Sequence, residues 1–326
     1  MAAAQPERLT ALDLVGSALA GRQESFAVTG ATGWFGATAL DLLYGALGDD
    51  APTRVTAYAS AERTVVVGDG RRVAVRPLSD LLQARPSPSV LMHFAYLTRD
   101  KVAELGTQEY VTRNVALSAS VLEAVRRLRP RHVIVASSGA VYATDGGLAR
   151  DVVADPYGSL KRLDELAFRA AADEVGATCV VPRVFSVAGP HMTKPEKYAL
   201  GDMLATARAG RPVFVRAAGP VYRSYCGVDE VVALSLWASL RGMSLTFDSG
   251  GTVVEMSELA ATVASVAGGR LVQRASFDPG LPADRYCGDP GPMAALAREA
   301  GLRMRDLPEL LRATTWPGSA PARPTP

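Results

Sequence analysis

Three side chains near the middle of the sequence are of types that transfer protons. Tyr157 and Lys161 stand four residues apart, and Ser138 precedes them. A phenol is a poor acid at neutral pH because its unperturbed pKa is about 10. A nearby cation favours the phenolate and brings that pKa toward neutrality. Residues at i and i+4 share one face of a helix, so Lys161 can lie beside Tyr157 and act on it.

A glycine-rich loop far upstream indicates the partner of that proton transfer. Gly30, Gly33 and Gly36 follow an apolar run and open a helical pattern. The first glycine permits a tight turn, the second lets backbone approach a pyrophosphate, and the third lets the helix pack closely on the strand. The amino end of the helix then offers free N–H groups to phosphates. We therefore expect a nicotinamide dinucleotide, contacted by Gly30, Thr32, Gly33, Trp34, Phe35 and Gly36.

Together the loop and the Tyr/Lys pair predict coupled transfer of a hydride and a proton. An oxidised nicotinamide would be a second cation near the phenol and would shift its pKa further. The end of the second predicted strand bears on the choice of dinucleotide, since an acid there suits the ribose of NAD and a basic residue suits the 2′-phosphate of NADP. The strand ends at Ser60 without an acid, and Arg63 follows. We expect NADP held by Ser60 and Arg63; the alternative is NAD, with Glu62 in the place of the acid.

Composition excludes several other classes of function. The 326 residues are 48% hydrophobic and 21% charged, which is ordinary for a soluble α/β protein with one large core. A net charge of +2, with both signs interspersed, argues against binding to nucleic acid or to an acidic membrane. No apolar run reaches about 18 residues, and no signal peptide is recognisable, so we expect a cytoplasmic location. The three cysteines and three histidines are scattered, and we expect neither a disulfide nor a bound metal.

Hydrophobic periodicity predicts strands that alternate with helices in the first half of the chain. A hairpin is predicted around Gly68-Asp69-Gly70. Such alternation implies an α/β fold, a Rossmann-type doubly wound parallel sheet with right-handed crossovers. The predicted strands are 25–29, 54–59, 90–95, 132–137 and 178–184, and the predicted helices are 33–47, 107–129 and 157–175.

The domain organisation follows from where this pattern begins and loosens. Residues 1–24 form a helical extension, and residues 25–185 form the NAD(P)-binding domain. Residues 186–316 mix short strands and helices, which predicts a smaller C-terminal α/β substrate-binding lobe over the carboxyl edge of the sheet. We expect residues 225–250 to return to the first domain. The tail at 317–326 is rich in proline and alanine and is expected to be flexible.

The motifs around the catalytic residues carry a family resemblance. Ser137-Ser138-Gly139-Ala140-Val141-Tyr142 and Tyr157-Gly158-Ser159-Leu160-Lys161, with the glycine loop, resemble the extended branch of the short-chain dehydrogenase/reductase family. Its nucleotide-sugar members, such as UDP-galactose 4-epimerase, are the most similar, over about residues 25–315. The resemblance implies that Tyr157 is the acid/base and that Ser138 binds the substrate oxygen. It implies that Lys161 lowers the pKa of the tyrosine and binds the nicotinamide ribose.

Shorter segments extend the resemblance to the cofactor and substrate sites. His93-Phe94-Ala95 matches a strand that lines the cofactor, and Asn114 matches a helix asparagine in a water-linked network around the lysine. Arg223 matches an arginine that grips a substrate phosphate, as a guanidinium fits a diphosphate by paired bonds. Ser186 replaces an asparagine that contacts the substrate. The implied cofactor contacts also include Leu78, Phe94 and Ala95, and the implied substrate contacts are Tyr96, Ser186, Arg223 and Arg274.

Departures from the family pattern narrow the reaction. Dehydratases of the family carry an Asp-Glu pair after the serine or threonine, and decarboxylases carry a glutamate; Gly139 and Ala140 stand at those positions here. What remains is redox chemistry at one carbinol of a nucleotide-diphosphate sugar, normally C4. We favour a 4-ketoreductase that uses NADPH. The alternatives are a 4-epimerase with tightly bound NAD, a reductase of small ketones or aldehydes, and a non-catalytic dinucleotide sensor. Helices 107–129 and 157–175 are expected to form the seam of a homodimer.

Overall fold

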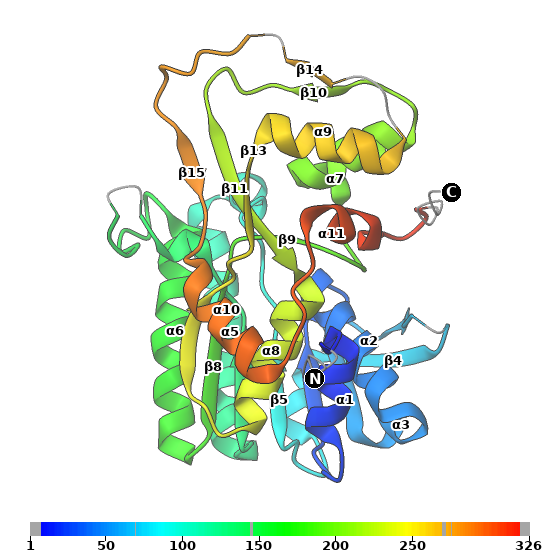
Figure 1. Ribbon diagram of the computed structural model, residues 1–326. Coiled ribbons are helices and arrows are strands. Elements are labelled where there is room, and N and C mark those ends of the chain that lie inside the picture. The colour runs from blue at the N-terminus through cyan, green and yellow to red at the C-terminus, as the bar shows by residue number, and fades with distance from the viewer. Residues whose placement is uncertain (1–7, 69, 144–145, 269–271, 275, 320–326) are drawn as a thin grey trace.

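The computed structural model describes residues 8–68, 70–143, 146–268, 272–274 and 276–319, which form a large sheet domain and a smaller lobe (Figure 1). The large sheet has the strand order β12-β8-β6-β5-β1-β2-β4-β3, and β7 pairs with β8. The pairs are parallel except for β3 with β4, so the predicted Rossmann-type doubly wound sheet is confirmed. Its strands are β1 Phe26–Thr29, β2 Val55–Ala59, β3 Arg63–Val66, β4 Arg72–Pro77, β5 Val90–His93, β6 His132–Val135, β7 Ser137–Ser138, β8 Thr178–Val184 and β12 Leu245–Asp248.

Helices cover both faces of this sheet, because successive side chains of a strand point to opposite sides. Phe26 and Val28 of β1 belong to one hydrophobic cluster, and Ala27 between them belongs to the other. Helices α1, α2 and α8 pack together on the first face, whereas α5 and α6 pack together on the second. The helices of this domain are α1 Ala11–Leu19, α2 Trp34–Leu47, α3 Ala51–Arg54, α4 Lys101–Leu105, α5 Thr107–Leu128, α6 Pro156–Val175, α8 Val228–Leu240 and α10 Pro290–Ala300.

The predicted N-terminal helix forms as α1, and residues 1–7 lie outside the described part of the chain. Thr10 caps it, with Asp13 completing a reciprocal capping box. The buried side chains, at helical spacing, face α2 and α8, so this extension is part of the main core. These side chains are Ala11, Leu14, Val15 and Leu19.

The predicted hairpin also forms and extends the sheet at one edge. Strand β3 pairs antiparallel with β4, and β4 pairs parallel with β2. The turn residue Asp69 lies outside the described residues, but the backbone N–H of Gly68 donates to Asp41 at 2.6 Å. The hairpin is therefore tied to helix α2.

Residues 228–248 lie in the sheet domain rather than in the lobe. Helix α8 packs against α1 and α2, and β12 pairs in parallel with β8 at the other edge of the sheet. Strand β11, Val221–Gly227, is instead the centre of the lobe sheet, where β13 Thr252–Glu255, β15 Asp284–Tyr286 and β9 Ser186–Ala188 pair with it. The chain thus leaves the lobe at the end of β11.

The remaining lobe elements lie above the carboxyl ends of the large sheet in Figure 1. Strands β10 and β14 pair in parallel beside helices α7 and α9. The predicted tail begins within the described residues, but 320–326 lie outside them. The remaining elements of the lobe are α7 Ala199–Arg208, β10 Val213–Val215, α9 Met256–Ala267, β14 Val272–Arg274 and α11 Leu307–Ala313.

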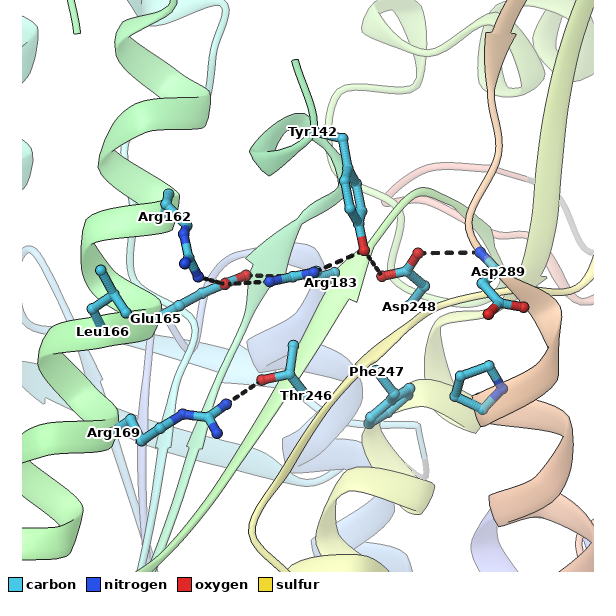
Figure 2. A pocket seen from close by; sticks show the side chains of 11 residues that line it. Tyr142, Arg162, Glu165, Leu166, Arg169, Arg183, Thr246, Phe247, Asp248 and Asp289 are labelled. Atoms are coloured by element: carbon cyan, nitrogen blue, oxygen red, sulfur yellow. Dashed lines mark hydrogen bonds and ion pairs between the residues drawn. The ribbon is translucent and has the colours of Figure 1, made fainter. Parts of the chain in front are cut away.

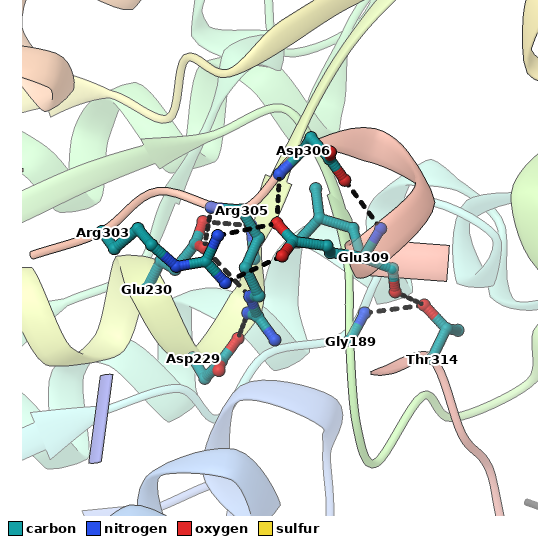
Figure 3. Close-up of polar contacts among 10 residues, drawn as sticks. Gly189, Asp229, Glu230, Arg303, Arg305, Asp306, Glu309 and Thr314 are labelled. Carbon is teal, nitrogen blue, oxygen red and sulfur yellow. Dashed lines mark hydrogen bonds and ion pairs between the residues drawn. The ribbon is translucent and has the colours of Figure 1, made fainter. Parts of the chain in front are cut away.

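A polar cluster ties the C-terminal segment to the start of α8 (Figure 3). Arg305 pairs with Asp229 and with the buried Glu230, whose other oxygen accepts the backbone N–H of Gly227 at 2.8 Å. The hydroxyl of Thr314 accepts the backbone N–H of Gly189 at 2.9 Å. These contacts hold α11 across the boundary between the sheet domain and the lobe.

Within the described ranges, no helix has the length and apolarity to cross a lipid bilayer. Over the same residues, no group of three or more His, Cys, Asp or Glu side chains has an arrangement that could bind a metal ion. Cys179, Cys226 and Cys287 are free thiols, and the first two are buried.

Candidate functional site

The glycine loop is shaped by close contacts at two of its three glycines. Gly30 has φ +70°, and a Cβ there would lie 2.5 Å from the backbone of Phe94 and Ala95. A Cβ at Gly36 would lie 2.1 Å from the Gly30 carbonyl oxygen. At Gly33 a Cβ would lie 3.3 Å from the Gly30 carbonyl oxygen, which is tight but less obstructed than at the other two glycines. The tight turn at Gly30 and the close packing at Gly36 agree with the sequence prediction, and the approach of a pyrophosphate at Gly33 stays a prediction.

The start of helix α2 has the properties of a phosphate site. Gly33 is its N-cap and makes no side-chain capping bond, so no side chain satisfies the first N–H groups. Gly33, Trp34, Phe35 and Gly36 line a cavity of about 570 Å³ at this point. Uncapped N–H groups and the positive end of the helix dipole suit the pyrophosphate of a dinucleotide. The residues present therefore fit such a cofactor.

The same cavity extends to the predicted catalytic residues and to the lobe. Its other walls come from the ends of β5 and β7, the start of α6, the lobe strands β9, β11 and β15, and the segment leading into α7. Among the residues predicted from the sequence, it is lined by Gly33, Trp34, Phe35, Gly36, Phe94, Tyr96, Ser138, Tyr157, Lys161, Ser186 and Arg223.

Local features of the chain place Tyr157 beside Ser138. Asp155 caps α6 by accepting from Gly158 at 3.1 Å, and Pro156 occupies the first helical turn. A Cβ at Gly158 would lie 2.2 Å from the Ala140 carbonyl oxygen. The start of α6 can therefore approach the turn after Ser138 only with glycine at this position.

The pKa of Tyr157 is raised, which corrects the sequence expectation. Burial is the largest cause, and the nearby Ser138 hydroxyl is the largest effect that opposes it. The Lys161 ammonium donates to the Ala136 carbonyl at 2.9 Å and lies 3.6 Å from the centre of the Tyr96 ring. Burial of the phenol disfavours its charged form, and this effect on the pKa is larger than that of the charges around Tyr157.

Lys161 is itself a buried cation. Burial lowers its pKa to about 8, while Asp164 and Glu165 pull it upward. Glu165 accepts from Arg183 and Arg162 (Figure 2). It also accepts from the hydroxyl of Ser137 at 2.7 Å. This carboxylate joins the site to a neighbouring polar pocket, where Arg183 also donates to the Tyr142 hydroxyl at 2.7 Å.

Several predicted cofactor residues lie outside the cavity lining. Ser60 and Arg63 are exposed at the end of β2 and the start of β3, and Leu78 begins a short 3-10 helix, Leu78–Gln83. Thr32 and Ala95 belong to the glycine loop and to the segment packed on it, together with Gly30.

Asn114, for which the resemblance implies a water-linked network around Lys161, has direct contacts to the loop after β5 and to its own helix. Its side-chain oxygen accepts the backbone N–H of Leu97 at 2.9 Å, and its amide donates to the Tyr110 carbonyl at 3.3 Å. It therefore holds the loop after β5, rather than contacting Lys161 directly. That loop carries Tyr96 into the cavity.

Arg274 is not in the cavity, because the lobe itself uses its donors. The guanidinium donates to the carbonyls of Ala217 at 3.0 Å and Gly219 at 2.7 Å and pairs with Glu255. It also stacks on Phe277, with 3.9 Å to the ring centre. These contacts connect β14 to β13, and the expected contact with substrate phosphate finds no support.

Several cavity residues were not among the predicted site residues, and two of them bear directly on the chemistry of the site. Tyr286 in β15 places its hydroxyl 3.3 Å from the Ser138 Oγ, and its ring packs on Phe185. Arg99 lines the cavity just beyond the end of β5, and its charge acts on Tyr157 and Tyr286. Arg99 could have been predicted from the sequence, because it follows a buried strand. Tyr286 reaches the cavity through the pairing of β15 with β11, which local sequence patterns do not predict.

The segment 190–198 closes one side of the cavity over the glycine loop. The Trp34 ring nitrogen donates to the Pro190 carbonyl at 2.7 Å, and the Trp34 ring meets that of Tyr198 edge-on at 5.5 Å. Lys194 reaches Asp100 across the opening, at 3.4 Å. The lobe and the sheet domain therefore enclose the cavity jointly.

The turn after Ser138 has no room for larger side chains. A Cβ at Gly139 would lie 2.5 Å from the Phe185 ring, and Ala140 is buried. Phe185 packs in turn on Tyr142 and Tyr286. A carboxylate at position 139 would require this aromatic group to move.

The fold and the cavity define a dinucleotide-binding α/β protein whose ligand lies at the carboxyl ends of a parallel sheet. The chain belongs to the NAD dependent epimerase/dehydratase family, whose sequence profile matches residues 26–244. The resemblance drawn from the catalytic motifs is thereby confirmed.

Known relatives are similar over limited segments. The probable UDP-glucuronate 4-epimerase of Rhizobium meliloti is 24% identical over 151 residues, which is 44% of each chain. The UDP-glucose 4-epimerase of Mycoplasma genitalium is 32% identical over 111 residues, 31% of this chain and 33% of that one. The matched segments thus span less than half the length of these relatives.

The fold similarity covers more of the chain. The structure of UDP-glucose 4-epimerase from Brucella ovis in complex with NAD superposes with a TM-score of 0.71 and 20% identity, covering 90% of this chain and 97% of that chain. The lobe is therefore shared along with the sheet domain.

Proposed function

We propose that the protein is a nucleotide-sugar 4-epimerase that retains NAD. The observation that carries this proposal is the convergence of Ser138, Tyr157 and Lys161 on one cavity between the uncapped start of α2 and Arg223 in the lobe. One end of this cavity suits a dinucleotide, and the other carries cations that suit a diphosphate.

The proposed chemistry divides between the cofactor and the chain. NAD, when bound, supplies a nicotinamide that accepts a hydride and returns it. Tyr157 takes the proton of the sugar C4 hydroxyl and later gives it back, and the adjacent Ser138 hydroxyl hydrogen-bonds the same oxygen. Lys161 lines the same cavity and supplies positive charge there, which the buried Tyr157 needs to ionise.

Recognition of the substrate phosphates is assigned to the lobe. Arg223 pairs with Asp284 at 2.7 Å, and the exposed fraction of the Asp284 side chain is 61%. A diphosphate can therefore replace this carboxylate as the partner of the guanidinium without leaving a buried charge unpaired. Arg99 and Lys197 line the same cavity and add positive charge.

The small residues after Ser138 support this choice within the family. Gly139 and Ala140 can neither abstract the C5 proton nor expel a C6 hydroxyl, as a dehydratase must. The two curated relatives are named 4-epimerases, and the Brucella structure contains NAD. A 4-ketoreductase that uses NADPH is the second candidate, because the end of β2 presents the exposed Ser60 and Arg63 without an acid at the strand end.

Two measurements on one protein preparation distinguish the epimerase from the ketoreductase. The purified protein is denatured to release and identify its dinucleotide, and the native enzyme is incubated with UDP-glucose, UDP-glucuronate or UDP-N-acetylglucosamine. The epimerase is expected to yield NAD and the C4 epimer of at least one sugar, and Tyr157→Phe is expected to lose this turnover while keeping NAD. Oxidation of added NADPH by a 4-keto nucleotide sugar, without epimerisation, would instead establish the ketoreductase.

We also propose a homodimer. Leu163 and Leu166 on α6 are each 52% exposed, and Val115 on α5 is 43% exposed. These apolar side chains lie on the two helices that pack together on one face of the sheet. A second copy would cover them.

A further inference from the structure

A buried polar cluster lies behind Lys161, between α6, α5 and the loop after β5. The Tyr96 hydroxyl, the Ser118 Oγ and the Asp164 Oδ2 are inaccessible to solvent and lack a hydrogen-bond partner among the residues that the structure describes. Asp164 is 6% exposed, and Lys161 is 6% exposed. The Ser118 hydroxyl is close enough to lower the pKa of Asp164, but a buried carboxylate without an ion pair is still costly, and an apolar side chain would fill the same space at lower cost.

The neighbouring Glu165 is satisfied by other groups. Both of its oxygens accept from Arg183 at 2.8 Å, and one of them also accepts from Arg162 at 3.2 Å (Figure 2). The other oxygen also accepts from the Ser137 hydroxyl. Two guanidinium groups therefore already neutralise this carboxylate. Asp164 has no ion pair of this kind within the described chain.

Lys161 is the cation that Asp164 faces. The two residues are three apart on α6, on one side of the helix. The Lys161 ammonium has one carbonyl acceptor, Ala136, and the face of the Tyr96 ring, so no carboxylate contacts it directly. A buried ammonium held only by a carbonyl and a ring tends to lose its proton unless an anion stands nearby.

We propose that Asp164 is a positioning residue that acts as the counter-ion of Lys161 and keeps this lysine protonated in the cavity that it shares with Tyr157. Its carboxylate acts through the lysine and takes no part in the reacting bonds. Only the expected effect on turnover rests on the proposed function. The charge state of Lys161 is a property of the chain itself.

Glu165 also raises the pKa of Lys161, but two guanidinium groups already neutralise that carboxylate, and the remaining titratable groups around Lys161 carry no negative charge. His93 on β5 is neutral, because burial and Lys161 lower its pKa to about 3. Burial raises the pKa of Tyr96, and of Tyr110 on α5 which faces it, so both stay neutral phenols. Burial also raises the pKa of Asp164 itself, and Lys161 opposes that rise. Each member of the pair thus favours the charged form of the other.

Removing the charge of the Asp164 carboxylate lowers the pKa of Lys161, so the ammonium loses its proton at a lower pH. An opposite charge at this range typically shifts a pKa by about 1–3 units. Any step that needs the lysine cation then fails on the alkaline side first.

The chain offers an unusually direct measurement, because it contains four lysines: Lys101, Lys161, Lys194 and Lys197. The full-length protein labelled with ε-¹³C lysine should give four Cε signals, and that of Lys161 is the one missing in Lys161→Arg. We expect Asp164→Asn to lower the pKa of Lys161 by about one unit or more. Asp164→Glu should restore most of the shift, and Asp173→Asn, an exposed aspartate on the same helix, should leave it unchanged.

The unaltered protein provides a test that does not depend on folding of a variant. Its Lys161 Cε signal should show a second, acid-side inflection as Asp164 takes up a proton. A Lys161 signal without that inflection, or a folded Asp164→Asn protein with an unchanged Lys161 pKa, overturns the proposal.

Activity supplies an independent readout. In Asp164→Asn the alkaline limb of the kcat profile should move to lower pH while KM for the nucleotide sugar changes little. Absence of epimerase activity in the unaltered protein would count against the proposed function and leave the lysine titration intact.

Discussion

At the scale of single residues, small side chains decide which functional groups can come together in the cavity. Gly158 lets the start of α6 touch the turn after Ser138, and Gly139 lets the Phe185 ring lie against that turn. Tyr157 and Ser138 thereby meet without any carboxylate between them. Positions with hydrogen or methyl side chains thus agree with the proposed redox chemistry at a carbinol.

Arg223 gives a prediction at this scale. Replacing it with alanine should raise KM for the nucleotide sugar about tenfold, because a charge-assisted hydrogen bond contributes about 1.5 kcal/mol. The maximal rate should change little, since in the proposed binding mode the guanidinium contacts the phosphates rather than C4. Steady-state kinetics over a range of substrate concentration measure both quantities.

Arg285 is the matched control for this change. It is an exposed arginine in the neighbouring strand β15, stacked on the Tyr222 ring with 4.1 Å to its centre, and it is not among the cavity-lining residues. Arg285→Ala should leave KM unchanged. If Arg223→Ala also leaves it unchanged, the substrate has no diphosphate, and a reductase of small ketones or aldehydes becomes the better description.

At the scale of elements, the C-terminal segment is fixed to α8 by a buried ion pair (Figure 3). Arg305→Met would leave Glu230, which is 1% exposed, without its cation. Removing one partner of a buried pair typically costs about 3 kcal/mol or more. We expect this loss in the free energy of unfolding, measured by urea denaturation followed by circular dichroism.

A surface pair in the same segment is the control for Arg305. Arg303 pairs with Glu309 at 2.8 Å, but both side chains are largely accessible to solvent. Arg303→Met should therefore change stability little, because exposed pairs are screened. Equal losses in the two variants would mean that α11 packing, and not the buried charge, holds this segment.

The sequence predicts the elements of the sheet domain well because each carries its own local pattern. Strand β1, helix α2 and helix α6 follow from apolar spacing, glycines and a proline near them. The pairing of strands β11 and β15 cannot be predicted from local patterns, since their partners come from distant parts of the chain. The same holds for the site: the glycine loop and Tyr157 are local motifs, whereas the position of Tyr286 depends on the lobe fold.

Two contacts could not be inferred from spacing at all. Lys161 was expected beside the Tyr157 phenol, but its ammonium lies on the Tyr96 ring, which arrives from the loop after β5. Arg274 was expected at a phosphate, but Glu255 and two lobe carbonyls surround it. In both cases a tertiary contact, invisible in the order of residues, decides where a long side chain ends.

At the scale of the whole molecule, the cavity belongs to neither part alone. The sheet domain contributes the glycine loop and Tyr157, and the lobe contributes Ser186, Arg223 and Tyr286. The segment 190–198 and α11 connect the two parts on one side. The face formed by α5 and α6 lies away from these connections, so it is available for contact with another chain (Figure 1).

That face gives the last prediction, on assembly. Exposed leucines at 163 and 166 would be covered by a second copy of the chain, since apolar patches of this kind mark interaction sites. Light scattering should give about twice the 34.2 kDa mass of one chain, and Leu163→Glu with Leu166→Glu should reduce it to one. Phe214→Glu, at a lobe residue that is 55% exposed, should leave the mass unchanged. A single-chain mass for the unaltered protein would show instead that these leucines face solvent and that each cavity works alone.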